Sequence, residues 1–130
     1  MTPAEFQQHL DSDPYLSRVV GQAARAGQRG RTFGILTEAA VVALMFPIIR
    51  YVLYEIGLPW LSELRRYSEL HRQRVHDWID THYQQHGVDP DEAEAASDAL
   101  LDKLEQTTDE RAQASWQQLT ELIKSEGGDE

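Results

Sequence analysis

The chain has no cysteine among its 130 residues. This absence excludes a disulfide framework, a thiolate zinc site and a cysteine nucleophile. The sequence also lacks a phosphate-binding Walker loop, a dinucleotide-binding glycine fingerprint, a GxSxG nucleophile motif and an HExxH zinc motif. We therefore expect no enzymatic activity and no cofactor, and nothing in the sequence indicates a small-molecule substrate.

No segment alternates apolar and polar residues with the period of two that marks a half-buried strand. Helix-start signals recur instead. Thr2 to Glu5 forms a capping-box pattern, and Asp13-Pro14 and Asp89-Pro90 each place a capping residue before a proline at the first helical position. The sequence therefore predicts an all-α fold that begins with short N-terminal amphipathic helices.

Basic residues are scarce in the last third of the chain. Residues 89–130 hold thirteen acidic and three basic residues, whereas residues 1–88 hold nine of each, so the net charge of −10 belongs to the C-terminal part. An acidic surface repels the phosphate backbone, and we therefore do not expect nucleic acid binding. Docking to a basic partner surface, or solubility alone, accounts for this charge better.

Between Glu38 and Arg50 no residue is charged or strongly polar. On a helical wheel with Glu38 at 0°, Arg50 falls at about 120° and Glu55 at about 260°, so no face collects the charges. A helix that is apolar all round is either fully buried or surrounded by lipid. The sequence favours a membrane-spanning helix within residues 32–58, capped by Thr32.

The span itself runs from Phe33 to Tyr54. Twenty-two helical residues are about 33 Å long, against a hydrocarbon core of about 30 Å. The predicted span residues are Phe33, Ala39, Val42, Leu44, Phe46, Pro47, Ile49 and Tyr54. Glu38 and Arg50 are the intramembrane polar residues, which either reach toward the interfaces or pair with a partner subunit.

Two other interpretations of this segment stay open. The charge-free run of 11 residues, 39–49, is short for a span, so the segment could be a helix buried in a soluble, cytoplasmic oligomer, or an interfacial or re-entrant segment. Topology is nearly undetermined, because four arginines flank each side of the segment. The weakly favoured orientation for a single-pass protein places the C-terminal domain in the cytoplasm.

The remaining chain divides around this helix. Residues 1–31 hold the N-terminal helices and an Arg/Gly connector, residues 59–126 an acidic helical domain, and residues 127–130 a disordered tail. Within 59–126, three amphipathic stripes predict a three-helix bundle whose first helix starts at Pro59. The predicted bundle core consists of Leu61, Leu64, Val75, Trp78, Leu100, Leu104, Trp116, Leu119 and Ile123.

The histidines are the only candidates for site chemistry. His82 and His86 are i, i+4 neighbours and His71 lies three turns earlier, so they are weak candidates for a metal site. No metal-binding motif accompanies them, and ordinary polar helix residues explain the pattern better. His76 and Asp80 have the spacing of a surface pair on one helix.

These observations favour a small single-span membrane protein, an accessory or assembly subunit or a small effector, that docks a protein partner through its acidic helical domain. The first alternative is a soluble all-α interaction module whose apolar helix is buried by homo-oligomerisation or by a partner protein. The second alternative is an oligomeric pore in which Glu38 or Arg50 would face water.

Overall fold

The computed structural model describes residues 1–28, 37–62, 66–84 and 89–127. Every regular element in these ranges is a helix, which confirms the predicted all-α class. The α-helices are α1 (Pro3–Asp11), α2 (Pro14–Gly27), α3 (Glu38–Tyr51), α4 (Glu69–Gln84), α5 (Pro90–Glu105) and α6 (Glu110–Gly127). A π-helical turn, η1 (Val52–Ile56), continues α3, and a 3-10 turn, η2 (Pro59–Leu61), follows it.

Three predicted helix starts are confirmed because capping depends on local sequence. Thr2 and Glu5 form a reciprocal capping box at α1. The side chain of Asp13 accepts hydrogen bonds from the first turn of α2, and that of Asp89 accepts one from Asp91 in α5. Each cap satisfies backbone N–H groups that have no partner inside the helix.

The predicted start of the apolar helix is wrong. The helix begins at Glu38 and not near Thr32, because Thr37 is the N-cap and its hydroxyl accepts a hydrogen bond from the Ala40 N–H at 3.1 Å. Thr37 directly precedes an acidic first-turn residue, which the positive end of the helix dipole favours. The predicted cap Thr32 and span residue Phe33 lie outside the described residues.

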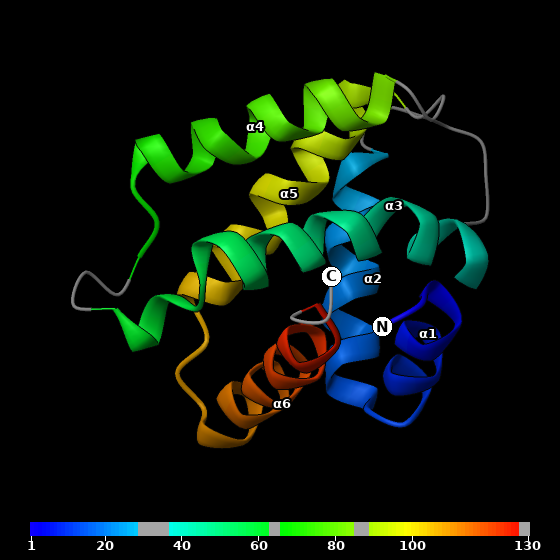
Figure 1. The fold of residues 1–130 in the computed structure, drawn as a ribbon, viewed down its shortest axis with the longest axis vertical. Coiled ribbons are helices and arrows are strands. Elements are labelled where there is room, and N and C mark those ends of the chain that lie inside the picture. The colour runs from blue at the N-terminus through cyan, green and yellow to red at the C-terminus, as the bar shows by residue number, and fades with distance from the viewer. Residues whose placement is uncertain (29–36, 63–65, 85–88, 128–130) are drawn as a thin grey trace.

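Helix α3 lies at the centre of the molecule (Figure 1). It contacts α1, α2, α4 and α5, and η1 contacts α6. Helix α5 packs against both α2 and α4, and α6 packs against α2 as well as η1. The three C-terminal helices therefore share one core with α2 and α3. Gly27 permits the close approach of α2 to α5, because a Cβ there would lie 2.5 Å from the carbonyl oxygen of Glu92.

The aliphatic side chains of α3 and η1 are sorted by size between two faces. The large apolar residues face the other helices, and each is at most 6% exposed: Val42, Leu44, Met45, Phe46, Ile48, Ile49, Val52 and Leu53. The outward arc holds Ala39, Ala40, Ala43 and Tyr54, which are exposed, together with half-buried Pro47 and Arg50. Of the predicted span residues, Val42, Leu44, Phe46 and Ile49 are thus covered by the chain itself.

The predicted bundle core is buried at six positions: Val75, Leu100, Leu104, Trp116, Leu119 and Ile123. Trp78 is half-buried, and Leu64 lies outside the described residues. Leu61 is a correction, because it is 65% exposed. Gly57, with φ of 97°, and Pro59 end the preceding helix, so Leu61 belongs to the short η2 turn and α4 starts only at Glu69, not at Pro59.

A hydrogen bond ties α4 to the middle of α3. The buried hydroxyl of Tyr83 donates to the backbone carbonyl of Leu44 at 2.5 Å. Pro47 lies three residues further on and has no N–H, so the α3 ladder is interrupted in this turn. The π-helical turn then closes with a bond from the Gly57 N–H to the Val52 carbonyl at 2.8 Å. Tyr83 therefore adds a hydrogen bond from α4 to the turn of α3 in which a backbone donor is missing.

Replacing Tyr83 with phenylalanine tests this tie. The Tyr83→Phe variant removes one buried hydrogen bond, while the Leu44 carbonyl keeps its place in the backbone ladder of α3. We therefore expect a loss of about 0.5–1.5 kcal/mol in the free energy of unfolding. Urea unfolding at neutral pH measures it. Tyr54→Phe is the matched control, since Tyr54 is 44% exposed and surface changes cost at most about 0.5 kcal/mol. Equal effects of the two substitutions would contradict the assignment.

Alkaline pH provides a second prediction. Burial raises the pKa of the Tyr83 hydroxyl, and burial together with the negative charge of Glu105 raises that of Tyr67, against the opposing charge of Arg72. A raised phenol pKa favours the neutral form in the fold, so its stabilising contribution is complete below the unfolded value of about 10 and is lost as pH rises further. We expect urea stability to fall more steeply above about pH 10 in the wild type than in a Tyr67→Phe/Tyr83→Phe double variant. Parallel slopes would overturn this expectation.

Candidate functional site

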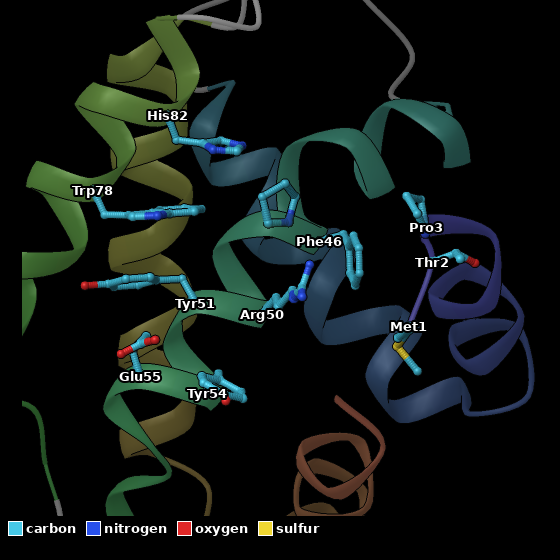
Figure 2. A pocket seen from close by; sticks show the side chains of 11 residues that line it. Met1, Thr2, Pro3, Phe46, Arg50, Tyr51, Tyr54, Glu55, Trp78 and His82 are labelled. Atoms are coloured by element: carbon cyan, nitrogen blue, oxygen red, sulfur yellow. The ribbon is translucent and has the colours of Figure 1, made fainter. Parts of the chain in front are cut away.

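A cavity of about 700 Å³ lies between the start of α1, helix α3 with η1, and helix α4 (Figure 2). We call it the α3–α4 groove. Residues 1–3 form one end, side chains from Phe46 to Glu55 form the floor, and Trp78 and His82 form the wall on α4. Its volume lies within the range of about 300–1,000 Å³ that is common for ligand pockets, and its lining is mostly apolar and aromatic.

Three stacked rings form the α4 side of the groove. Tyr51 stacks on Trp78 with ring centroids 4.7 Å apart and planes at 15°. Trp78 stacks on His82 at 4.7 Å and 13°. Trp78 and His82 share one face of α4 because they are four residues apart, and Tyr51 reaches them from the last residue of α3. Offset-stacked rings stabilise a fold beyond their buried area, so this stack fixes α3 relative to α4.

Two charged side chains line the groove, Arg50 and Glu55. Figure 2 shows the Arg50 guanidinium between Phe46 and Tyr51, while Glu55 lies beneath Tyr51. The second predicted intramembrane polar residue, Glu38, is elsewhere: its carboxylate accepts a hydrogen bond from the Gln7 amide of α1 at 2.7 Å. The structure therefore places Arg50 and Glu38 in separate surroundings and brings only Arg50 into the groove.

The groove ends where the backbone departs from α-helical geometry. Tyr54 and Glu55 belong to the π-helical turn η1, which changes the direction in which their side chains leave the helix. At the other end, Phe6 of α1 packs against Phe46 with ring centroids 4.9 Å apart. The N-terminal helix, the apolar helix and α4 are thus all needed to form the cavity.

The three weak metal candidates do not form a site in the part of the chain that the structure describes. His71 belongs to the first turn of α4, where it and Ser68 exchange hydrogen bonds at 3.1 and 3.3 Å. His82 belongs to the aromatic stack, about 16 Å further along the same helix, and His86 lies outside the described residues. No group of three His, Cys, Asp or Glu side chains in the described ranges could hold a metal ion.

The prediction that His76 pairs with Asp80 is wrong. The ring nitrogens of His76 face α5, with Nδ1 3.2 Å from Glu94 and Nε2 2.8 Å from Asp98. Burial, followed by the nearby charge of Asp80, raises the pKa of the Glu94 carboxyl, whereas the charge of His76 opposes this rise. Helix α5 places two carboxylates one turn apart opposite His76, and this cross-helix arrangement is invisible in the sequence of α4 alone.

Arg72 extends the same charged contact between α4 and α5. Its guanidinium lies 2.8 Å from Asp102 and 2.6 Å from Glu105. The second oxygen of Glu105 accepts a hydrogen bond from the backbone N–H of Tyr67 at 2.8 Å. Several carboxylates of the acidic C-terminal third therefore form ion pairs and hydrogen bonds within the fold, in contacts between α4 and α5.

No protein-family model, curated protein or solved structure matches this chain. Among the described residues, one helical segment, Glu38–Leu61, is long and apolar enough to cross a bilayer by length and composition, and 44% of its most apolar window is buried by the rest of the chain. Sequence reasoning named Trp78 only as a core residue and missed the groove. The i, i+4 pair of Trp78 and His82 was the available signal, because it predicts two flat rings on one helix face.

Removal of the central ring tests the stack. Trp78→Leu retains an apolar side chain but loses both stacked contacts, each worth about 0.5–1.5 kcal/mol. We expect a loss of about 1–3 kcal/mol in the free energy of unfolding by urea, and a change in the ring-current shifts at the His82 ring protons in NMR spectra, since only the contribution of the Tyr83 ring remains. Leu70→Ala is the control on the same helix, because Leu70 is 69% exposed. Unchanged His82 shifts in the tryptophan variant would show that the rings do not stack in solution.

Proposed function

We propose that this chain is an all-α interaction module that works outside the bilayer, with α3 as its core helix and the α3–α4 groove as its docking site. The supporting observation is the sorting of side chains by size around α3. Its large aliphatic residues face the other helices, whereas the alanines, Pro47 and Arg50 lie on the outward arc together with Tyr54 of η1. The large apolar face of α3, which is unfavourable in water, is thus covered by the chain's own helices.

Insertion into a bilayer would require α3 to leave these neighbours. Val20, Ala23 and Ala24 of α2 are 0% exposed, and α2 contacts both α3 and α5. Removal of α3 would expose the part of this core that α3 covers, at a cost of about 25 cal/mol per Å² of apolar surface. In addition, Gly57 ends the regular helix with a positive φ, and Arg50 and Glu55 lie before it. These features support a core helix over a span.

A single-span accessory subunit is the second candidate function. It is favoured by the length and apolarity of the Glu38–Leu61 segment. In that case α3 would lie in lipid, and the groove would not exist as described. The two candidates therefore differ in how α3 responds to a charge on its outward arc.

Adjacent arginine substitutions distinguish the two candidates. Val42 is 6% exposed, whereas its neighbour Ala43 is exposed. In a core helix, Val42→Arg buries an unpaired charge and should unfold the protein, while Ala43→Arg should change stability by at most about 0.5 kcal/mol. We expect this contrast in soluble yield and in circular dichroism melting of the purified chains.

A bilayer span gives a different result. Val42 and Ala43 would lie at nearly the same depth, so each arginine would cost a similar amount, about 2.5–3.5 kcal/mol at the helix centre. An alkaline carbonate wash of membranes from expressing cells measures insertion directly. Wild-type protein retained in the washed pellet, with both variants equally depleted from it, would overturn the proposed module.

A further inference from the structure

We propose that the α3–α4 groove binds an extended segment of a partner protein in which an apolar side chain stands next to a carboxylate. This inference rests on the proposed function, because it requires the groove to be a docking site. It adds the chemistry of the occupant, which is argued from the length of the groove, its ring geometry and the position of its charges.

The length of the groove suits a short extended segment. Its floor runs from Phe46 to Glu55, ten residues whose nine helical steps span about 13 Å. An extended chain rises about 3.3 Å per residue, so about four residues would occupy it. A cavity of about 700 Å³ can take at least one large side chain of such a segment. Phe46, Pro47 and Tyr54 provide apolar surface for that side chain.

The ring stack favours negative charge. Because Tyr51, Trp78 and His82 lie on one another, the inner ring faces are covered. Figure 2 shows Trp78 and His82 extending from α4 with their ring ends toward the groove. The edge of an aromatic ring carries the positive part of its quadrupole, whereas the face carries the negative part. A wall of ring edges therefore attracts an anion and does not form a cage for a cation.

Arg50 provides the formal positive charge. Its guanidinium lies beside Phe46 and Tyr51, within reach of the apolar part of the groove (Figure 2). Arg50 already has an interaction within the chain, but a guanidinium carries five N–H donors and can bind a carboxylate in addition. Glu55 lies at the Tyr54 end, so it repels a carboxylate there and directs it toward Arg50.

Three capped tripeptides of equal length test this chemistry: N-acetyl-Phe-Glu-Leu-amide and its Gln and Lys counterparts. Each is titrated into the full chain while the Trp78 indole N–H is followed by NMR. A charge-assisted hydrogen bond at a half-exposed site predicts that the Glu peptide binds about three- to tenfold more tightly than the Gln peptide, and the Lys peptide more weakly still. Arg50→Gln should remove the difference between Glu and Gln, and Arg25→Gln, an exposed arginine on α2, should preserve it.

The outcomes separate the inference from the proposed function. Equal binding of the three peptides at Trp78 would retain the docking groove but overturn its preference for a carboxylate. Tightest binding of the Lys peptide would overturn that preference too, and would assign the dominant charge to Glu55. If no peptide shifts Trp78, both proposals fail. Trp78 shifts that depend on protein concentration alone would show that a second copy of the chain fills the groove.

Discussion

Burial of one face of α3 is the constraint on which the other helices depend. A segment with this much apolar surface is unfavourable in water, and its apolar surface is too wide for any single amphipathic helix to cover. Four helices contact α3 itself and α6 contacts its continuation η1. Met45, Ile48 and Ile49 are 0% exposed as a result. The arrangement of the whole domain follows from the need to surround these side chains.

The missing backbone donor within α3 and the end of this helix are stabilised by tyrosine side chains. Pro47 removes one backbone donor, and the Tyr83 hydroxyl of α4 binds a carbonyl in the preceding turn. Beyond it, the π-helical turn and Gly57 end the helix and redirect the chain into η2. Tyr67 secures this end, since its hydroxyl donates to the Gly57 carbonyl at 2.7 Å. Tyr83 thus donates a hydrogen bond near Pro47, and Tyr67 donates one at Gly57, where the apolar helix ends.

The fold class and three of the helix caps could be predicted because they depend on residues a few positions apart. The location of α3 could not, because a wheel that sorts residues by polarity finds no face on this helix. Sorting its aliphatic residues by volume does, since Ala39, Ala40 and Ala43 fall on the arc opposite Met45 and Ile48. An exposed alanine loses almost nothing in water compared with an exposed leucine or isoleucine, so the alanines mark the exposed arc of α3 even though Tyr54 and Arg50 share it.

The partners of the histidines and the presence of the groove could not be predicted from the sequence, because both depend on contacts between helices. The sequence of α4 suggests Asp80 as the partner of His76, but the distance to α5 decides in favour of Glu94 and Asp98.

The groove depends on long-range packing in the same way, because its wall, its floor and its end come from three helices. Tyr51 links two of them through the stack, so an occupant that contacts Trp78 also contacts the joint between α3 and α4. Binding there would stabilise the packing of α3 itself, because a ligand that binds only the folded state shifts the unfolding equilibrium. The docking site proposed for this chain and the burial of its apolar helix are therefore energetically coupled.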